Sequence, residues 1–517
     1  MDATVSRAGA TLSGKNLIAL AAVCLAALMF GLEISSVPVI LPTLQKILHG
    51  HFRDLEWIEN AYTLACTTVL MAAGTLADRY GRKRMFVISL LVFGMTSLTC
   101  GLATDASVLI ASRFLQGLGG GAMLIGLIAV LSHQFREGRE RSMAFGVWGV
   151  VFGIGLGFGP IIGGAIASLA TWRWVFLVHV PLTVATLALA LLSVQESRDP
   201  QAERLDVLGI VTLSAAVFCL TYFIIQGPVV GFDGAVAIAA VTASLVCLVL
   251  FVWVEKRHSH PMFDFSVFRI RDFAGAICGS IGMNFSFWPL VIYLPIYFQG
   301  ALGYDVVTAS VALLAYTLPT LVVPPLAERL ALRYRPRAVI PAGLFVIGVG
   351  FLSMQYGCRI EHASWLTMLP GCLLAGIGLG LTNTPVTNTT TGAVPAARAG
   401  MASGIDMSAR LITLAINIAM MGFILLEGIA VYLKRALGTS IDAPTQHVFA
   451  EKIASGNLDE VLRSLPNTHA DVVVRQALMS GFSLIMLYGG IGVWLLASIS
   501  FMAFRAAAMA PRVVRED

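Results

Sequence analysis

The chain is a succession of long apolar runs interrupted by short clusters of charged residues. A membrane-spanning helix needs about 20 consecutive apolar residues, and fourteen runs of about this length follow one another along the 517 residues. No segment has the short alternating pattern of a lipid-facing β-barrel. The pattern therefore predicts an all-α membrane protein with fourteen spans, an even number that places both termini on one side. The expected spans are 16–42, 55–77, 84–103, 107–132, 143–169, 172–194, 206–227, 234–254, 273–299, 306–330, 337–357, 365–392, 400–433 and 474–505.

The composition excludes a soluble or disordered chain. Hydrophobic residues make up 57% and charged residues only 12%, whereas a soluble domain carries about 25% charged residues. The net charge of +5 does not indicate nucleic-acid binding, because in a membrane protein the position of Lys and Arg matters more than their sum. The eight cysteines form no Cys-x-x-Cys pair, so we expect neither a metal site nor a disulfide framework.

The basic residues predict how the chain is oriented. Loops on the side of both termini hold 23 Lys and Arg residues, and loops on the opposite side hold nine. Cytoplasmic loops carry the excess of positive charge, so we expect both termini in the cytoplasm and the segment 434–473 outside. Residues 9–16 are similar to a phosphate-binding loop, but Asn16 replaces its hydroxyl residue and an apolar span follows. We expect no nucleotide and no other cofactor.

Two charged residues lie deep within predicted spans. Glu33 is about seventeen residues into the first span, and Arg113 is about six residues into the fourth. An ionisable group inside the membrane is a candidate functional site, and both are candidates for proton coupling. Simpler roles stay open: Glu33 as a hydrogen-bonding partner of Ser35 or Ser36, and Arg113 as a side chain that extends to the membrane surface.

Asp406 and Arg410 form a second candidate pair for proton coupling. Their i,i+4 spacing places them on one face of a helix. A purely structural ion pair is the alternative. Glu56 and Glu59, at the outer end of the second span, are expected to face water or lipid headgroups.

The segment 74–84, GTLADRYGRKR, has a glycine–acid–glycine pattern among cations. Its glycines permit a tight turn between two helices, and its carboxylate can cap a neighbouring helix. A plain cytoplasmic anchor would explain the cations but not this spacing. The pattern predicts a cytoplasmic gate made of Gly74, Asp78, Arg79, Gly81 and Arg82.

The segment 153–164, GIGLGFGPIIGG, contains overlapping pairs of glycines four residues apart. Such pairs let another helix approach closely inside a membrane, and a proline adds a kink. The segment predicts a moving or sealing interface, with ordinary close packing as the alternative. The residues concerned are Gly155, Gly159, Pro160, Gly163 and Gly164.

Polar and aromatic residues within the spans 273–299 and 365–392 predict a substrate cavity. Polar groups in a span cannot face lipid without penalty, and aromatic faces can hold cations. Packing within the bundle is the simpler alternative. The candidate lining residues are Asn284, Phe285, Trp288, Tyr293, Tyr297, Asn383 and Asn388.

Five motifs in this order resemble those of the major facilitator superfamily, and in particular its branch of fourteen-helix drug/proton antiporters. They are LEISSVPVILP, GTLADRYGRKR, Arg113 with Gln116 and Gly117, GIGLGFGPIIGG, and WRWVFLVHVP. The chain departs from the family pattern at several positions. Glu33 replaces an aspartate, Ser36 and Pro38 replace other signature residues, and His179 replaces an asparagine.

The resemblance implies two six-helix bundles, over residues 1–205 and 258–517, with substrate bound between them near the midplane. Residues 206–257 would be two additional spans. Glu33 would occupy the acid site, Arg113 would belong to the proton-coupling network, and Asp78 would belong to the gate.

We therefore expect a proton-coupled exporter of drugs or other small amphipathic compounds, including cationic ones, in the inner membrane of a bacterium. We expect a monomer without enzymatic activity, and accessory export proteins stay open as partners. A proton-coupled importer is the first alternative, although the glycines of 153–164 and the lack of the importers' E-x-x-E-R signature argue against it. A non-transporting receptor is the second.

Overall fold

The structure is a computed structural model. It describes residues 14–48, 51–135, 138–198, 206–257, 265–360, 363–394, 399–437, 443–455, 461–462 and 470–508. All regular structure within these ranges is helical, which confirms the prediction of an all-α chain.

The first helix group comprises α1 to α7, in which α1 packs along α5 and α7 while α4 packs along α2 and α3. The predicted span 172–194 is divided in two at Val178. The bounds are α1 (Gly14–Leu48), α2 (Phe52–Tyr80), α3 (Arg82–Leu102), α4 (Ala106–Gln134), α5 (Gly138–Leu169), α6 (Arg173–Leu177) and α7 (His179–Ser193).

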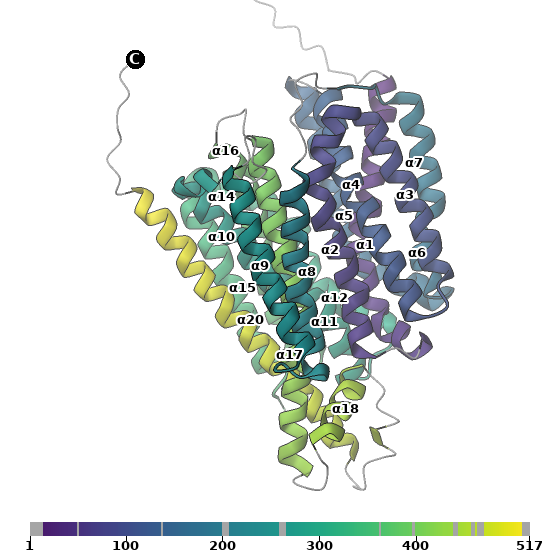
Figure 1. Ribbon diagram of the computed structural model, residues 1–517, viewed down its shortest axis with the longest axis vertical. Coiled ribbons are helices and arrows are strands. Elements are labelled where there is room, and N and C mark those ends of the chain that lie inside the picture. The colour runs from purple at the N-terminus through teal and green to yellow at the C-terminus, as the bar shows by residue number, and fades with distance from the viewer. Residues whose placement is uncertain are drawn as a thin grey trace, which may run out of the picture.

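Two further helices, α8 (Val207–Val230) and α9 (Ala235–Arg257), form an antiparallel pair. Helix α8 packs against α2 of the first group and against α17 of the second. The pair therefore lies along the junction of the two groups, as Figure 1 shows in teal.

The second helix group is less regular than the first. The predicted span 306–330 is interrupted at Leu318 and Val323, each followed by a proline that lacks the N–H for a helical hydrogen bond. The chain bends there by 45° between Val306–Val322 and Pro324–Tyr334. The elements are η1 (Phe265–Arg269), α10 (Arg271–Phe285), α11 (Phe287–Ile296), η2 (Tyr297–Ala301), α12 (Val306–Thr317), α13 (Pro319–Val322), α14 (Pro324–Tyr334), α15 (Pro336–Gly357), α16 (Trp365–Gly392), α17 (Ala399–Leu437), α18 (Ala443–Ala454) and α20 (Ala470–Ala508).

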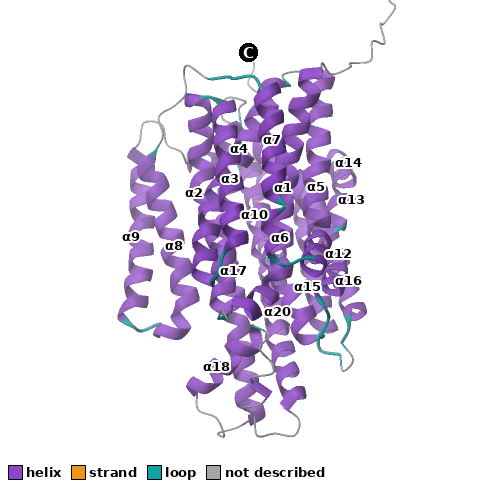
Figure 2. Cartoon of the chain, turned by 90° about the vertical axis from the view of Figure 1, so that its right-hand side faces the viewer, coloured by secondary structure: helices purple, strands orange, loops and turns teal. Residues whose placement is uncertain are grey.

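Among the described residues, twelve helical stretches are long and apolar enough to cross a membrane, or thirteen if the bent pair is one span. Helix α2, predicted as a span, is outside this set. The start of α1 and the end of α20 lie at the same end of the molecule (Figures 1 and 2), which we call the termini side. The opposite end, the loop side, carries α18, a helix within the segment predicted to be an external loop.

The two helix groups meet through α5 with α12, α2 with α17, and α1 with α11. Hydrogen bonds join them: the Thr317 hydroxyl donates to the carbonyl of Gly157 (2.9 Å), and the Gln299 amide donates to that of Val39 (3.0 Å). Gly164, near the loop-side end of α5, faces Ser310 of α12 so closely that a Cβ there would overlap the Ser310 hydroxyl.

The opposite face of α5 packs against α1 with almost no intervening side chain. A Cβ on Gly155 would lie 2.9 Å from the carbonyl oxygen of Leu28, and Cβ atoms on Gly159 and Gly163 would overlap Ser35 and Ser36. The Ser35 hydroxyl lies 3.0 Å from the carbonyl of Gly155. The glycines of 153–164 therefore allow two helices to approach α5 closely, α1 on one face and α12 on the other.

We expect Gly155→Ala to lower the apparent unfolding temperature of the purified protein in detergent. The new methyl group would meet backbone atoms of α1, which cannot move aside as a side chain can, at a cost of about 1–3 kcal/mol. Gly149→Ala, in the same helix with nothing within 4 Å of its Cβ, is the matched control and should stabilise by about 0.5–1 kcal/mol. Equal unfolding temperatures for both variants would contradict the close seam.

Candidate functional site

The centre of the first helix group holds a completely buried arginine, Arg113 of α4. Its Nε donates to the carbonyl of Ile58 in α2 (3.1 Å), and its Nη1 donates to Gln116 Oε1 (2.9 Å). The same Nη1 is hydrogen-bonded to Glu33 Oε1 of α1, which is also completely buried. The structure thus brings together Glu33 and Arg113, and Arg113 is turned into the protein rather than toward the membrane surface.

A second carboxyl group approaches the same guanidinium. Glu59 Oε2 of α2 lies 3.7 Å from Arg113 Nη2, and the Tyr62 ring lies 4.3 Å from the guanidinium carbon, in cation–π contact. Glu56 and Glu59 were expected to face water or headgroups, and that expectation is wrong: they are 4% and 5% exposed. Their helix turns them inward, where Arg113 and the second helix group face them.

His179, at the start of α7, completes this cluster. Its Nδ1 lies 3.5 Å from Glu33 Oε2, and its Nε2 lies 3.2 Å from the carbonyl oxygen of Met29. The Phe93 ring packs edge-on against the imidazole. The sequence marked His179 only as a departure from a family motif. The paired departures, a longer acid at 33 and a base at 179, were the available signal that the two side chains meet.

The predicted pair Asp406–Arg410 is also formed, in the second helix group. Asp406 accepts hydrogen bonds from Arg410 Nε (3.1 Å) and from the Ser280 hydroxyl of α10. Arg410 in turn donates to Asn383 Oδ1 (2.6 Å) and to the Thr387 hydroxyl (3.0 Å), both on α16. Asn383, predicted to line a cavity, is thus tied to this ion pair.

The other predicted cavity residues do not gather in one place. Tyr297 is completely buried against Phe482, and Phe285 packs on Tyr488. Asn284 donates to the carbonyl of Ser280 in its own helix (2.9 Å). Trp288 is half-buried beside Phe287, and Asn388 is exposed.

Tyr293 is different because it reaches the other helix group. Its hydroxyl donates to the carbonyl of Ile418 (2.5 Å) and lies 3.4 Å from Glu56 Oε1 of α2. A Cβ on Gly422 would overlap the same carboxyl group. Glu56 is therefore enclosed where α2 of the first group meets α11 and α17 of the second.

The predicted gate residues lie around the turn from α2 to α3. Gly81 has φ +120°, a conformation that favours glycine, and the carboxylate of Glu196 occupies the place of its missing Cβ. The same carboxylate accepts from the backbone N–H groups of Lys83 (3.1 Å) and Arg84 (3.3 Å) and so caps α3. The turn is thus fixed by the segment after α7, a partner that the sequence did not indicate. The side chain of Asp78 lies outside the described residues.

Arg79 is exposed beside the ring of Tyr80, and Arg82 Nη1 lies 3.3 Å from His133 Nδ1 of α4. A Cβ on Gly74 would have only Ile125 near it, at 3.9 Å.

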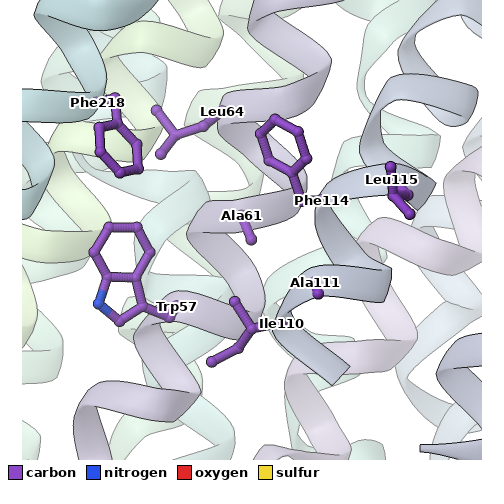
Figure 3. A pocket seen from close by; sticks show the side chains of 8 residues that line it. All are labelled: Trp57, Ala61, Leu64, Ile110, Ala111, Phe114, Leu115 and Phe218. Atoms are coloured by element: carbon purple, nitrogen blue, oxygen red, sulfur yellow. The ribbon is translucent and has the colours of Figure 1, made fainter. Parts of the chain in front are cut away.

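A crevice of about 420 Å³ opens between α2, α4 and α8 (Figure 3). Its wall is almost entirely apolar, and Phe114, Leu115 and Phe218 on its rim are about half exposed. Phe218 of α8 lines one side, and none of the charged residues of the Glu33–Arg113 cluster is among the described lining residues, so the crevice is a surface feature separate from that cluster. Its lining residues are Trp57, Ala61, Leu64, Ile110, Ala111, Phe114, Leu115 and Phe218.

Comparison with known proteins places this arrangement in a family. Residues 23–418 match the family model described as "Major Facilitator Superfamily". The chain belongs to the Major Facilitator Superfamily. It is therefore a multi-pass membrane protein of a transporter family.

Proteins of Mycobacterium tuberculosis and Streptomyces glaucescens are among those similar to this chain. The chain is 34% identical over 439 residues to "Multidrug resistance protein Stp" of Mycobacterium tuberculosis, covering 85% of this chain and 81% of that one. It is 28% identical over 507 residues to "Tetracenomycin C resistance and export protein" of Streptomyces glaucescens, covering 96% and 93%. Among solved structures, a bacterial homolog of the human lysosomal transporter Spinster, inward-facing and unoccupied, matches with a TM-score of 0.66 at 14% identity, covering 96% of this chain and 98% of that one.

The two buried glutamates of α2, Glu56 and Glu59, lie at different places relative to the two halves of a Major Facilitator Superfamily protein. Substrate and coupling sites of the superfamily lie near the midplane, where the two halves meet. Glu59 belongs to the cluster inside the first helix group, whereas Glu56 lies at the contact between the groups.

We expect Arg113→Met to destabilise the folded protein by about 3–5 kcal/mol, because it leaves Glu33 and Glu59 buried without their cation. The double variant Glu33→Gln/Arg113→Met should regain part of this loss, since it removes one of the two orphaned carboxyl groups. Thermal unfolding in detergent measures both. Additive effects of the two substitutions would show that the pair is not coupled.

Proposed function

We propose that this chain exports drugs or related small amphipathic compounds from a bacterial cell in exchange for protons. The observation that carries the proposal is the buried Glu33–Arg113 contact, with Glu59 and His179 beside it. Titratable groups are costly inside a membrane protein and mark proton pathways. The names of the similar proteins, which include "Drug efflux pump JefA" and "Puromycin resistance protein pur8", support drugs as the substrate class.

The proposed topology has fourteen spans in the inner membrane with both termini in the cytoplasm. Twelve described stretches, the bent α12–α14 segment and α2 make up this number, and the excess of Lys and Arg on the termini side supports the orientation. In this scheme α1–α7 and α10–α20 are the two six-span bundles, and α8 and α9 are the two additional spans. We propose a monomer, and accessory export proteins remain open as further partners.

Alternating access is supported by the way the groups meet. The contacts between α5 and α12, from Gly164–Ser310 to Gly157–Thr317, run from the loop side toward the middle. Beyond them the second group bends by 45° between Val306–Val322 and Pro324–Tyr334. Rocking of the two groups about these contacts would open the space between them to one side of the membrane and then to the other.

The proton gradient can drive this cycle without a nucleotide or other cofactor. One charge moving across about 100 mV is worth about 2.3 kcal/mol, which corresponds to an accumulation ratio of roughly fifty. Exchange of one proton for one monovalent cation moves no net charge, so that exchange would draw on the pH difference alone.

We expect Glu33→Gln to abolish proton-driven uptake of ethidium into inverted membrane vesicles, because the amide cannot bind and release a proton. Glu427→Gln is the matched control, because Glu427 lies on α17 and its side chain is 40% exposed. Ethidium uptake by this variant should equal uptake by the native protein. Asp406→Asn should keep more coupling than Glu33→Gln, because Asp406 pairs with Arg410 in the second helix group and, among the described residues, has no hydrogen bond or ion pair with the Glu33–Arg113 cluster that carries the proposal.

Full proton-driven uptake by Glu33→Gln would remove Glu33 from the coupling mechanism. In intact cells without their own pumps, collapse of the proton gradient should raise the ethidium content. A fall in content would instead favour the importer.

A further inference from the structure

We propose that His179 and Glu33 hold one proton in common, between the imidazole Nδ1 and the carboxyl Oε2, and that this is the proton exchanged during transport. The shared proton stands on the geometry alone, whereas its exchange rests on the proposed function.

The position of the imidazole proton follows from the partners of the ring. Nε2 lies 3.2 Å from the carbonyl oxygen of Met29, which can only accept a hydrogen bond. Nε2 therefore carries a hydrogen. In the neutral imidazole this leaves Nδ1 as an acceptor, 3.5 Å from Glu33 Oε2.

The contact between Nδ1 and Glu33 Oε2, at 3.5 Å, is favourable only when a proton lies on one of the two atoms. Without one, a lone pair faces a carboxylate oxygen in a site where both side chains are at most 1% exposed. Neither atom has a hydrogen-bond partner among the described residues. One proton resolves both deficits, either as imidazolium beside carboxylate or as imidazole beside carboxylic acid.

The charges around the Glu33–His179 pair also favour the binding of one proton. The groups facing it are Arg113 from α4, Glu59 and Tyr62 from α2, and Cys100 from α3. With Glu33 and Glu59 ionised and Arg113 charged, the cluster has two negative charges and one positive charge, so one proton bound within it makes it neutral. Loss of that proton leaves a net charge in a buried site, which is unfavourable until the surroundings change.

An amide side chain at position 179 could hydrogen-bond Glu33 but could not take up the proton. A histidine can do both, and it is the one side chain whose ordinary titration falls near physiological pH. His179→Asn therefore removes proton binding while keeping a side chain of similar polarity.

The test is nuclear magnetic resonance of the full chain in lipid nanodiscs, with ¹⁵N-labelled histidine and ¹³C-labelled glutamate. Spectra of His179→Asn and Glu33→Gln identify the two signals. We expect one member of the pair to be protonated at about pH 7, and the signals of the two residues to change together when the pH of the sample is varied. In Glu33→Gln, the amide N–H donates to Nδ1, so His179 should remain neutral throughout.

Glu427→Gln is the matched control, because it removes the acid that lies 4.0 Å from His447 on α18 and should leave the His179 signal unchanged. Two outcomes would overturn the shared proton. One is that both groups are unprotonated at about pH 7. The other is that His179 titrates identically in native protein and in Glu33→Gln.

Exchange of the proton has its own readout. Ethidium added to the purified native protein in weakly buffered detergent should release protons, and this release should be lost in His179→Asn. Release at the native level by His179→Asn would overturn the role of the pair in exchange. Absence of ethidium export by the native protein would contradict the proposed function, while the spectra would still decide the shared proton.

Discussion

A charged guanidinium in the middle of an apolar helix group must be matched by partners, and in this protein the partners come from all sides. Arg113 of α4 draws Glu33 from α1 and both a carbonyl and Glu59 from α2. Gln116, one helical turn further along α4, accepts a hydrogen bond from Arg113 and donates one to the Ser97 hydroxyl of α3. An uncompensated charge would cost several kcal/mol, so the helices can pack only in an arrangement that brings these groups together. The charged cluster thereby specifies the first helix group as much as the apolar contacts around it.

Close approach of the helices makes this arrangement possible. A Cβ on Gly117 would overlap the backbone carbonyl of Tyr62, and one on Gly155 would press against α1. Inside a membrane, apolar burial gives little drive for helices to associate, and close packing of small residues takes its place. Gly117 therefore brings α4 close to α2, where the polar cluster fixes their register, while Gly155 brings α5 close to α1.

The sequence predicted the class of fold and marked Glu33 and Arg113 as candidates, but it did not predict that these two side chains meet or which residues surround them. Apolar runs and charged loops are local, so the ranges of the spans could be read directly, and the intramembrane positions of Glu33 and Arg113 marked them as candidates. The sequence did not predict the places of Glu59 and His179 in the cluster, because these depend on which faces of α2 and α7 turn inward. The aromatic residues were misleading for the same reason: Tyr297 packs on Phe482 inside the second group, whereas Tyr293 crosses to the first. Residue type alone does not separate these cases.

Coupling between proton binding and movement needs an element that touches both the titrating site and the moving contact. Helix α2 meets this requirement, because Glu56 and Glu59 are three residues apart and so lie on neighbouring parts of one helical face. Glu59 faces Arg113 in the charged cluster, and Glu56 faces Tyr293 at the junction with the second group. The Asp406–Arg410 pair also lies on a helix at this junction, α17, although its hydrogen-bond partners Ser280, Asn383 and Thr387 all belong to the second group. Under the proposed proton coupling, α2 and α17, which pack against each other, are therefore the helices that would transmit a change from either charged site to the junction.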